Sequence, residues 1–396
     1  MRRPPAHLTF AWFWLLFFLL NFGQGVFPPL LPQVMDGLGL SFAGAGLLGT
    51  AFGLARFVTD VPAGMLVERR GAPGVLHAGI ACLLAGTALS AWAPSLPAML
   101  LARGLVGVGS GMTIVVAILF LMAGGPAGER TRRGNLYEVA VIGGTATSAW
   151  IGGAVAARVG WRWGFGVALG AIAVGWAIAT LRLLPGARET FARRPAAAAT
   201  GSAAPARREW GGILAIYLAT FSLAVAWAGG IGTFLPLYGG RGIGLDSETL
   251  GRTLSVAYAV EAALLVPIGW AADVLGRVRV LVPGFVVMLA GVLLVPWAEG
   301  VVGFGLGATL LVLGLTAWMV PPVLLAERLP GGFRGPAAGL YRVVADLAYV
   351  VAPGAVGWLI GDGGFALAGA TMAGLFGVAA VVSLVVLGPS SRSQRS

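Results

Sequence analysis

The sequence predicts an all-α membrane protein in which twelve transmembrane helices form two pseudo-symmetric bundles of six. Of its 396 residues, 58% are apolar and 10% are charged, whereas soluble domains carry about 25% charged residues. Apolar runs of roughly 20 residues, the length that spans a bilayer, recur along the whole chain. A glycine–acid–glycine pattern also occurs twice, 205 residues apart, which indicates a duplicated half.

The expected spans follow one another with short connections. In the first half they cover residues 8–32, 42–67, 74–93, 97–123, 135–157 and 163–184. In the second half they cover residues 211–237, 249–272, 278–297, 301–326, 335–360 and 364–387. The predicted parts of the chain are bundles at 1–184 and 210–389, a cytoplasmic linker at 185–209 and a disordered tail at 390–396.

The distribution of basic residues predicts the orientation. All 26 are arginines; with a cytoplasmic N-terminus, 19 fall on the cytoplasmic side and 3 in outer loops. This bias satisfies the positive-inside rule and predicts a multi-pass protein of the cell (inner) membrane with both termini in the cytoplasm. The net charge of +11 does not indicate nucleic-acid binding, because the arginines lie between apolar runs and form no basic domain.

The repeated pattern follows the second span of each half. Its first copy comprises Gly64, Glu68, Arg69, Arg70 and Gly71, and its second copy comprises Gly269, Asp273, Gly276 and Arg277. We expect Gly64 and Gly269 to let helices approach closely. The acids are expected to form charge-assisted hydrogen bonds that hold the halves together on the cytoplasmic side in one state. The alternative is that the neighbouring arginines only set the topology.

With these motifs the chain resembles the major facilitator superfamily of bacterial-type transporters. The repeat is similar to that family's Gly-x-x-x-Asp-Arg-x-Gly pattern, with Glu68 in place of the aspartate. Arg103 and Gly107 match its Arg-x-x-x-Gly motif inside a span. The chain departs from the family's drug–proton antiporters at Ser148 and Ala149, where those carry Gly-Pro. The resemblance implies transport by alternating access to the two sides of the membrane.

Charged residues inside spans are costly unless they are paired or hydrated. Arg56 and Asp60 lie four residues apart in the second span, as do Arg342 and Asp346 in the eleventh. The resemblance implies that these spans meet between the halves, where Asp60–Arg342 and Arg56–Asp346 pairs would close the cytoplasmic side while the outside is open. The alternative is two intrahelical pairs. Glu138, at the position of Arg342 in the repeat, is assigned to the same gate.

Glu261 is the main candidate for proton coupling. It matches Arg56 in the repeat and has no basic residue near it in the sequence. A carboxyl group inside a membrane without a basic partner is typical of a proton carrier. Asp60 is the second candidate, and a structural hydrogen bond is the alternative role for Glu261.

The resemblance also implies a central cavity lined by the first, fourth, seventh and tenth spans. The candidate lining residues are Asn21, Gln24, Arg103, Trp227, Thr316 and Trp318. This set is mostly aromatic and apolar, which suits amphipathic or hydrophobic solutes better than sugars. Arg103 could bind an anionic group or hydrogen-bond to backbone carbonyl groups.

The sequence therefore favours a secondary active antiporter that exports an amphipathic or hydrophobic small molecule in exchange for protons. The alternatives are proton-coupled uptake of an organic anion and a non-transporting membrane sensor or scaffold. No nucleophile–base set or metal-ligand spacing occurs in the sequence, so we expect no enzyme activity, metal or cofactor. The expected partners of this monomer are a small solute, protons and the lipid bilayer, with no nucleic acid.

Overall fold

A computed structural model describes residues 6–123, 127–187, 210–329 and 334–388, and all regular elements in these ranges are helical. The first half contains α1 (Ala6–Gly25), α2 (Phe27–Gly37), α3 (Phe42–Trp92), α4 (Leu96–Ala123), α5 (Ala127–Val159) and α6 (Trp161–Ile178). The second half contains α8 (Trp210–Val225), α9 (Leu235–Leu237), α10 (Ser247–Leu275), α11 (Arg277–Leu294), α12 (Gly300–Gly314), α13 (Val320–Arg328) and α14 (Arg334–Val382). Short π or 3₁₀ segments continue several of them: η1 (Ala179–Leu183), η2 (Ala226–Phe234), η3 (Tyr238–Gly242), η4 (Val295–Trp297), η5 (Leu315–Ala317) and η7 (Ser383–Leu387).

Ten continuous helical stretches within the described residues are long and apolar enough to cross a membrane. Two of them, Phe42–Trp92 and Gly339–Leu387, have 51 and 49 residues, about twice the length that one crossing needs. Each is interrupted by a glycine with a positive φ, 76° at Gly71 and 77° at Gly364. Because only glycine adopts such a conformation readily, each stretch is two helices joined at a kink.

The expected spans agree with the observed helices to within about five residues, except that α5 begins at Ala127 rather than at residue 135. The chain also stays helical through residue 187, past the expected start of the linker. The rest of that linker and the tail at 390–396 lie outside the described residues.

The outer surface of the helices is apolar. Three of the most exposed tryptophans lie at helix ends: Trp92 is 71% exposed, Trp163 66% and Trp297 78%. Tryptophan favours the boundary between lipid tails and water, and large exposed apolar side chains are expected where a helix faces lipid. The surface therefore agrees with the membrane class that the composition indicated.

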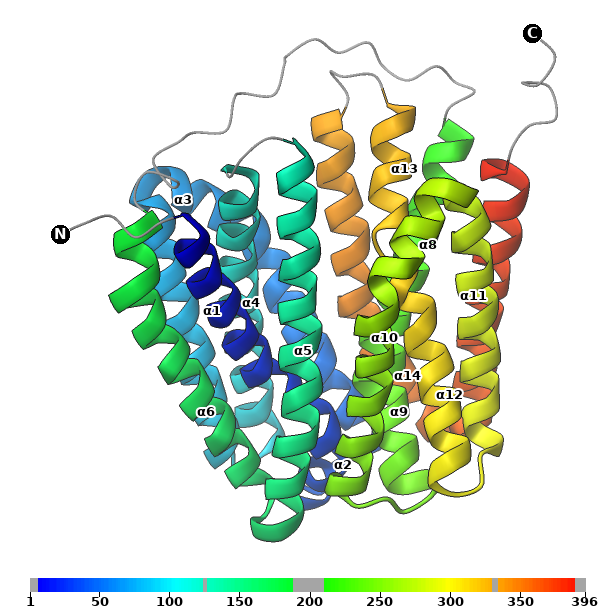
Figure 1. Ribbon diagram of the computed structural model, residues 1–396. Coiled ribbons are helices and arrows are strands. Elements are labelled where there is room, and N and C mark those ends of the chain that lie inside the picture. The colour runs from blue at the N-terminus through cyan, green and yellow to red at the C-terminus, as the bar shows by residue number, and fades with distance from the viewer. Residues whose placement is uncertain (1–5, 124–126, 188–209, 330–333, 389–396) are drawn as a thin grey trace, which may run out of the picture.

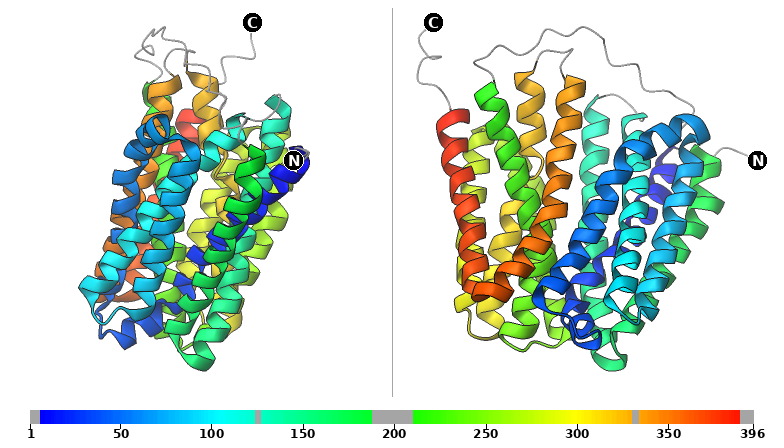
Figure 2. Two further views of the ribbon diagram at one scale, coloured as in Figure 1. Left: turned by 90° about the vertical axis from the view of Figure 1, so that its left-hand side faces the viewer. Right: turned by 180° about the vertical axis from the view of Figure 1, so that it is seen from behind.

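Helices of the two halves form separate groups that meet along one interface. Figure 1 shows α1 and α3–α6 on one side and α8–α14 on the other. Across the interface α3 packs against α14, and α5 packs against α10. Figure 2 shows from two further sides that α1 begins and η7 ends at the upper end of the molecule.

Backbones approach closely at the lower end of this interface. A Cβ atom on Gly357 of α14 would lie 3.0 Å from the Cα of Gly46 on α3. A Cβ atom on Gly251 of α10 would lie 3.4 Å from the Cα of Gly153 on α5. Small residues allow this close approach of membrane helices.

Two ion pairs also join the halves at this end. Asp36 pairs with Arg241, and Arg158 Nη2 lies 3.3 Å from Glu248 Oε2. Beside them, Asp246 caps α10 by accepting a hydrogen bond of 2.7 Å from the backbone N–H of Thr249. This bond lowers the pKa of Asp246.

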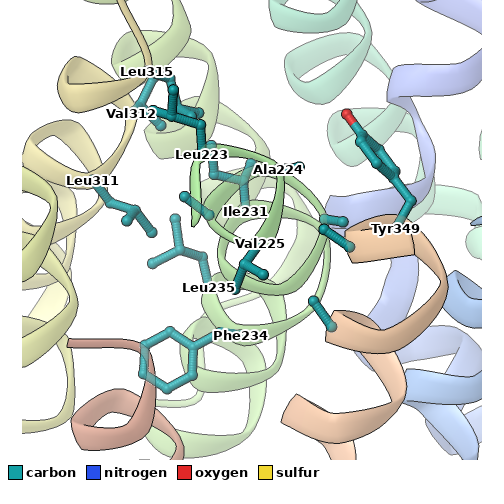
Figure 3. Packing of buried hydrophobic residues seen from close by; sticks show 14 of the residues in the cluster. Leu223, Ala224, Val225, Ile231, Phe234, Leu235, Leu311, Val312, Leu315 and Tyr349 are labelled. Atoms are coloured by element: carbon teal, nitrogen blue, oxygen red, sulfur yellow. The ribbon is translucent and has the colours of Figure 1, made fainter. Parts of the chain in front are cut away.

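The most buried part of the second half surrounds a π-helical segment. Figure 3 shows Ile231 and Phe234 of η2 packed with side chains of the neighbouring helices. Within η2 the Thr233 hydroxyl donates to the carbonyl of Ala228, five residues earlier, at 3.3 Å. A π turn widens the helix and often marks a functional site. Here it lies in the segment that carries Trp227.

Candidate substrate cavity and charge cluster

A cavity of about 500 Å³ lies between the two halves. This volume is in the usual range for sites that hold small molecules. Five of the six expected lining residues contribute to its wall: Asn21, Gln24, Arg103, Trp227 and Trp318. Thr316 is not part of the wall; its hydroxyl donates to the carbonyl of Leu313 at 2.7 Å, within its own helix.

The two amides of α1 are partly committed to their own helix. Asn21 Nδ2 donates to the carbonyl of Phe17 at 2.8 Å, and Gln24 Nε2 donates to that of Leu20 at 3.3 Å. Their oxygens accept no hydrogen bond from the described residues. These oxygens and the second N–H of each amide are therefore available to a bound solute.

Several aromatic residues of the cavity wall were not predicted. They come from the helices at the interface and include Phe27, Phe52, Tyr137, Tyr258 and Tyr349. Phe27 lies in the first expected span and was overlooked there, whereas the others lie on α3, α5, α10 and α14, outside the four spans to which the prediction was confined. One feature of the sequence could have indicated the tyrosines: Tyr137, Tyr258 and Tyr349 each lie one to three residues from a charged residue inside a span.

Four charged residues of α3 and α14 form a cluster between the halves. Arg342 Nε lies 2.6 Å from Asp60 Oδ2, and Arg56 Nε lies 3.4 Å from Asp346 Oδ1. Arg342 Nε also lies 3.0 Å from Asp346 Oδ2, within α14. Both pairs expected across the interface are thus present, together with one of the two intrahelical pairs. Asp346 is only 1% exposed and is shared by both arginines.

The pairs expected across the interface are present together with the close glycine contacts at the lower end. The wall of the cavity instead extends toward the upper helix ends, since it includes Leu121 near the end of α4, Gly134 near the start of α5 and Tyr341 near the start of α14. The cavity is therefore nearer to the upper end.

Two carboxyl groups line the cavity apart from this cluster. Glu138 on α5 and Glu261 on α10 both contribute to the wall. Glu261 is 4% exposed, and its Oε2 has no hydrogen-bond partner among the described residues. The cavity therefore holds acids from both halves.

Arg103 of α4 is stacked on aromatic rings of the same wall. Its guanidinium carbon lies 3.8 Å from the centroid of Phe27 and 5.1 Å from that of Phe52. The side chain is buried, and its Nε has no acceptor among the described residues. The structure thus does not show the backbone hydrogen bonds that were one of the two expectations for Arg103.

The repeated glycines differ in role from the expectation. No described atom lies within 4 Å of a Cβ placed on Gly64 or on Gly269, so neither glycine brings helices close together here. Gly71 and Gly276 instead have φ values of 76° and 103° and form the turns after their spans. The close approach that we expected at Gly64 and Gly269 occurs at other glycines.

The second copy of the repeat forms its ion pairs within the second half. Arg277 Nη1 lies 3.1 Å from Asp273 Oδ1, and Arg277 Nη2 lies 2.7 Å from Glu327 Oε1. In the first copy, Glu68, Arg69 and Arg70 are exposed. Among the described residues, the acids of the repeat therefore form no ion pair between the halves.

Residues 13–260 match the sequence model of the Major Facilitator Superfamily. MFS transporter L2 of Phoma sp. is 28% identical over 153 residues, which is 39% of this chain and 26% of that protein. The uncharacterized MFS-type transporter Rv1877 of Mycobacterium tuberculosis is 28% identical over 209 residues, 52% of this chain and 28% of that protein. The chain thus spans little more than a quarter of the length of these relatives.

Two solved structures share the fold. Each comparison covers 96% of this chain and 100% of the other protein's chain. They are the human organic anion transporter MFSD10 (TETRAN), with 18% identity and a TM-score of 0.65, and the nucleoside transporter NupG, with 13% identity and a TM-score of 0.72. At these identities the likeness concerns the fold alone. Because the family model matches more than half of its residues, the chain belongs to the Major Facilitator Superfamily of membrane transporters.

Proposed function

We propose that the protein is a secondary active transporter that exports a small amphipathic or hydrophobic solute in exchange for protons, by alternating access. With α3 and α14 each counted as two spans, the described residues would contribute twelve, six in each half. The interface between the halves, with its cavity and its charge cluster, supports a rocking motion of one half against the other. We further propose that it works as a monomer in the bilayer.

The upper end of the molecule is assigned to the cytoplasm. Its connections carry the exposed arginines Arg69, Arg70 and Arg279, which the positive-inside rule places on that side. With this orientation the structure represents a state that faces inward: the glycine contacts close the outer side, and the cavity extends toward the cytoplasm. The ion pairs between Arg56 and Asp346 and between Arg342 and Asp60 then remain formed between the halves while the outer side is closed.

The observation that carries the proposal is the position of Glu261. It lies in the cavity wall, buried, with one carboxyl oxygen that has no partner among the described residues. Such a carboxyl group can take up and release a proton without breaking an ion pair. Asp60 is the second candidate, because its Oδ1 also lacks a partner while its Oδ2 is held by Arg342.

Glutamine in place of Glu261 should abolish solute accumulation driven by a pH gradient while solute–solute exchange continues, because the amide cannot carry the proton. The measurement uses proteoliposomes with an internal pH dye and a solute chosen by thermal-shift screening of metabolites and drugs at two pH values. Glu299→Gln is the control, since Glu299 is exposed and does not line the cavity. Gradient-driven accumulation that survives Glu261→Gln would rule out this assignment.

Proton-coupled uptake of an organic anion is the second candidate function, and the unpaired Arg103 favours it. The same vesicles separate the two, because an exporter moves solute against the direction of proton flow and an uptake system moves both in one direction. A protein that shows neither ligand stabilisation nor proton flux would instead be a sensor or scaffold.

A further inference from the structure

Arg103 differs from the other arginines of the cavity wall in having no acidic partner. Arg56 and Arg342 both contact carboxylates within 3.4 Å. Arg103 is 7% exposed, yet no described residue forms an ion pair with it or accepts a hydrogen bond from it. A buried charge without a partner in a membrane protein is costly and marks a functional site.

The rings beside Arg103 stabilise its charge only in part. A guanidinium group 3.8 Å from the centroid of Phe27 gains from a cation–π interaction. Stacking occupies a face of the planar group, whereas its N–H bonds lie in the plane. The donors of Arg103 therefore still need acceptors, and the cavity is the space from which an acceptor can come.

We propose that Arg103 binds the anionic group of the transported solute, a carboxylate attached to an apolar body. This inference rests on the proposed transport function and specifies its substrate class. A guanidinium group presents two parallel N–H donors that match the two oxygens of a carboxylate. The apolar body of the solute then packs on Phe27 and Phe52, which line the same cavity.

The other charged residues near the cavity are less suited than Arg103 to bind an anionic group. Asp60 and Asp346 neutralise Arg342 and Arg56. Glu138 and Glu261 would repel an anion placed next to them, and Glu261 is assigned to the proton. An anionic group in the cavity is thus most favourably placed at the guanidinium group on α4.

The test compares acids with their uncharged amides. The full-length protein in phosphatidylcholine nanodiscs is titrated with 4-phenylbutyrate and with 4-phenylbutyramide, and binding is followed by calorimetry. We expect the acid to bind at least about tenfold more tightly, as for a hydrogen bond to a charged group. Arg103→Gln should remove the preference, and Arg103→Lys should retain part of it because the charge remains without the paired donors. Arg252→Gln, an exposed arginine on α10, should leave the preference unchanged.

Equal binding of acid and amide, or an acid preference that persists in Arg103→Gln, would overturn the inference. Competition by phosphatidylglycerol in the nanodisc would also overturn it, because the ligand would then be a lipid headgroup. The melting temperature of each variant without ligand shows whether it is folded. If Arg103→Gln is not folded, the preference of Arg103→Lys for acid over amide decides the test. Because binding needs no gradient, acid-selective binding without proton-driven transport would contradict only the proposed function.

Discussion

Exchanging the charges of Arg56 and Asp346 together should restore the transport that either single reversal abolishes. Asp346 is almost fully buried and lies 3.4 Å from Arg56 across the interface and 3.0 Å from Arg342 on its own helix. Arg56→Asp alone brings two carboxylates together, and Asp346→Arg alone brings together two or three guanidinium groups. Leaving a buried charge without its partner costs about 3–5 kcal/mol. We therefore expect each single variant to lose transport and to melt at a lower temperature.

A second exchange distinguishes the pairs across the interface from the pair within α14. Arg342→Asp combined with Asp346→Arg keeps opposite charges four residues apart on that helix. It also places a carboxylate opposite Asp60 and a guanidinium group opposite Arg56, so that like charges meet across the interface. If the contacts between the halves matter, this double variant should stay inactive while Arg56→Asp with Asp346→Arg recovers. The reverse outcome would show that the charges only neutralise one another within each helix. Transport in proteoliposomes and melting temperature are measured for both.

The cluster shows how much of the site the sequence could predict. A charge inside a membrane is costly unless it is paired or hydrated, which indicated that Arg56, Asp60, Arg342 and Asp346 need partners. The resemblance to the family implied that their two spans meet, and the structure contains both pairs across the interface together with one pair within α14. The helices were predictable for a similar reason, because each crossing needs a long apolar run. Glu261 lies in the cavity wall, as its proposed role requires.

Other parts of the site depend on tertiary contacts that leave no pattern in one sequence. The chain has 64 glycines, and composition cannot show which of them meets the backbone of another helix. Gly64 and Gly269 stand in the repeat, whereas the contacts occur at residues such as Gly251 and Gly357. Thr316 was placed in the cavity by family analogy, but the local helical geometry directs its hydroxyl to Leu313. Helical spacing in the sequence also does not foresee the π turn of η2.

Leucine in place of Gly251 or Gly357 should force the lower end of the interface apart. A Cβ atom on Gly251 would meet the backbone oxygen of Ala149, and one on Gly357 would meet that of Phe42. Both oxygens belong to helix backbone that cannot rotate away as a side chain can. Overpacking costs about 1–3 kcal/mol, which changes the ratio of molecules closed and open at the lower end by about 5- to 150-fold. We expect transport to fall because the state closed at the lower end becomes rare.

The opening can be measured directly between the halves. Spin labels at residues 92 and 297, in a Cys82→Ser background, report the distance between exposed positions on the α3–α4 and α11–α12 connections at the lower end of Figure 1. Gly357→Leu should lengthen this distance. Gly374→Leu on the same helix should not, because no described atom lies within 4 Å of its Cβ position. If Gly357→Leu transports normally at an unchanged distance, these glycines do not close the lower end. If the distance lengthens and transport is lost, the contact of two helix backbones limits the cycle, because only the absence of a side chain at these positions lets the lower end close.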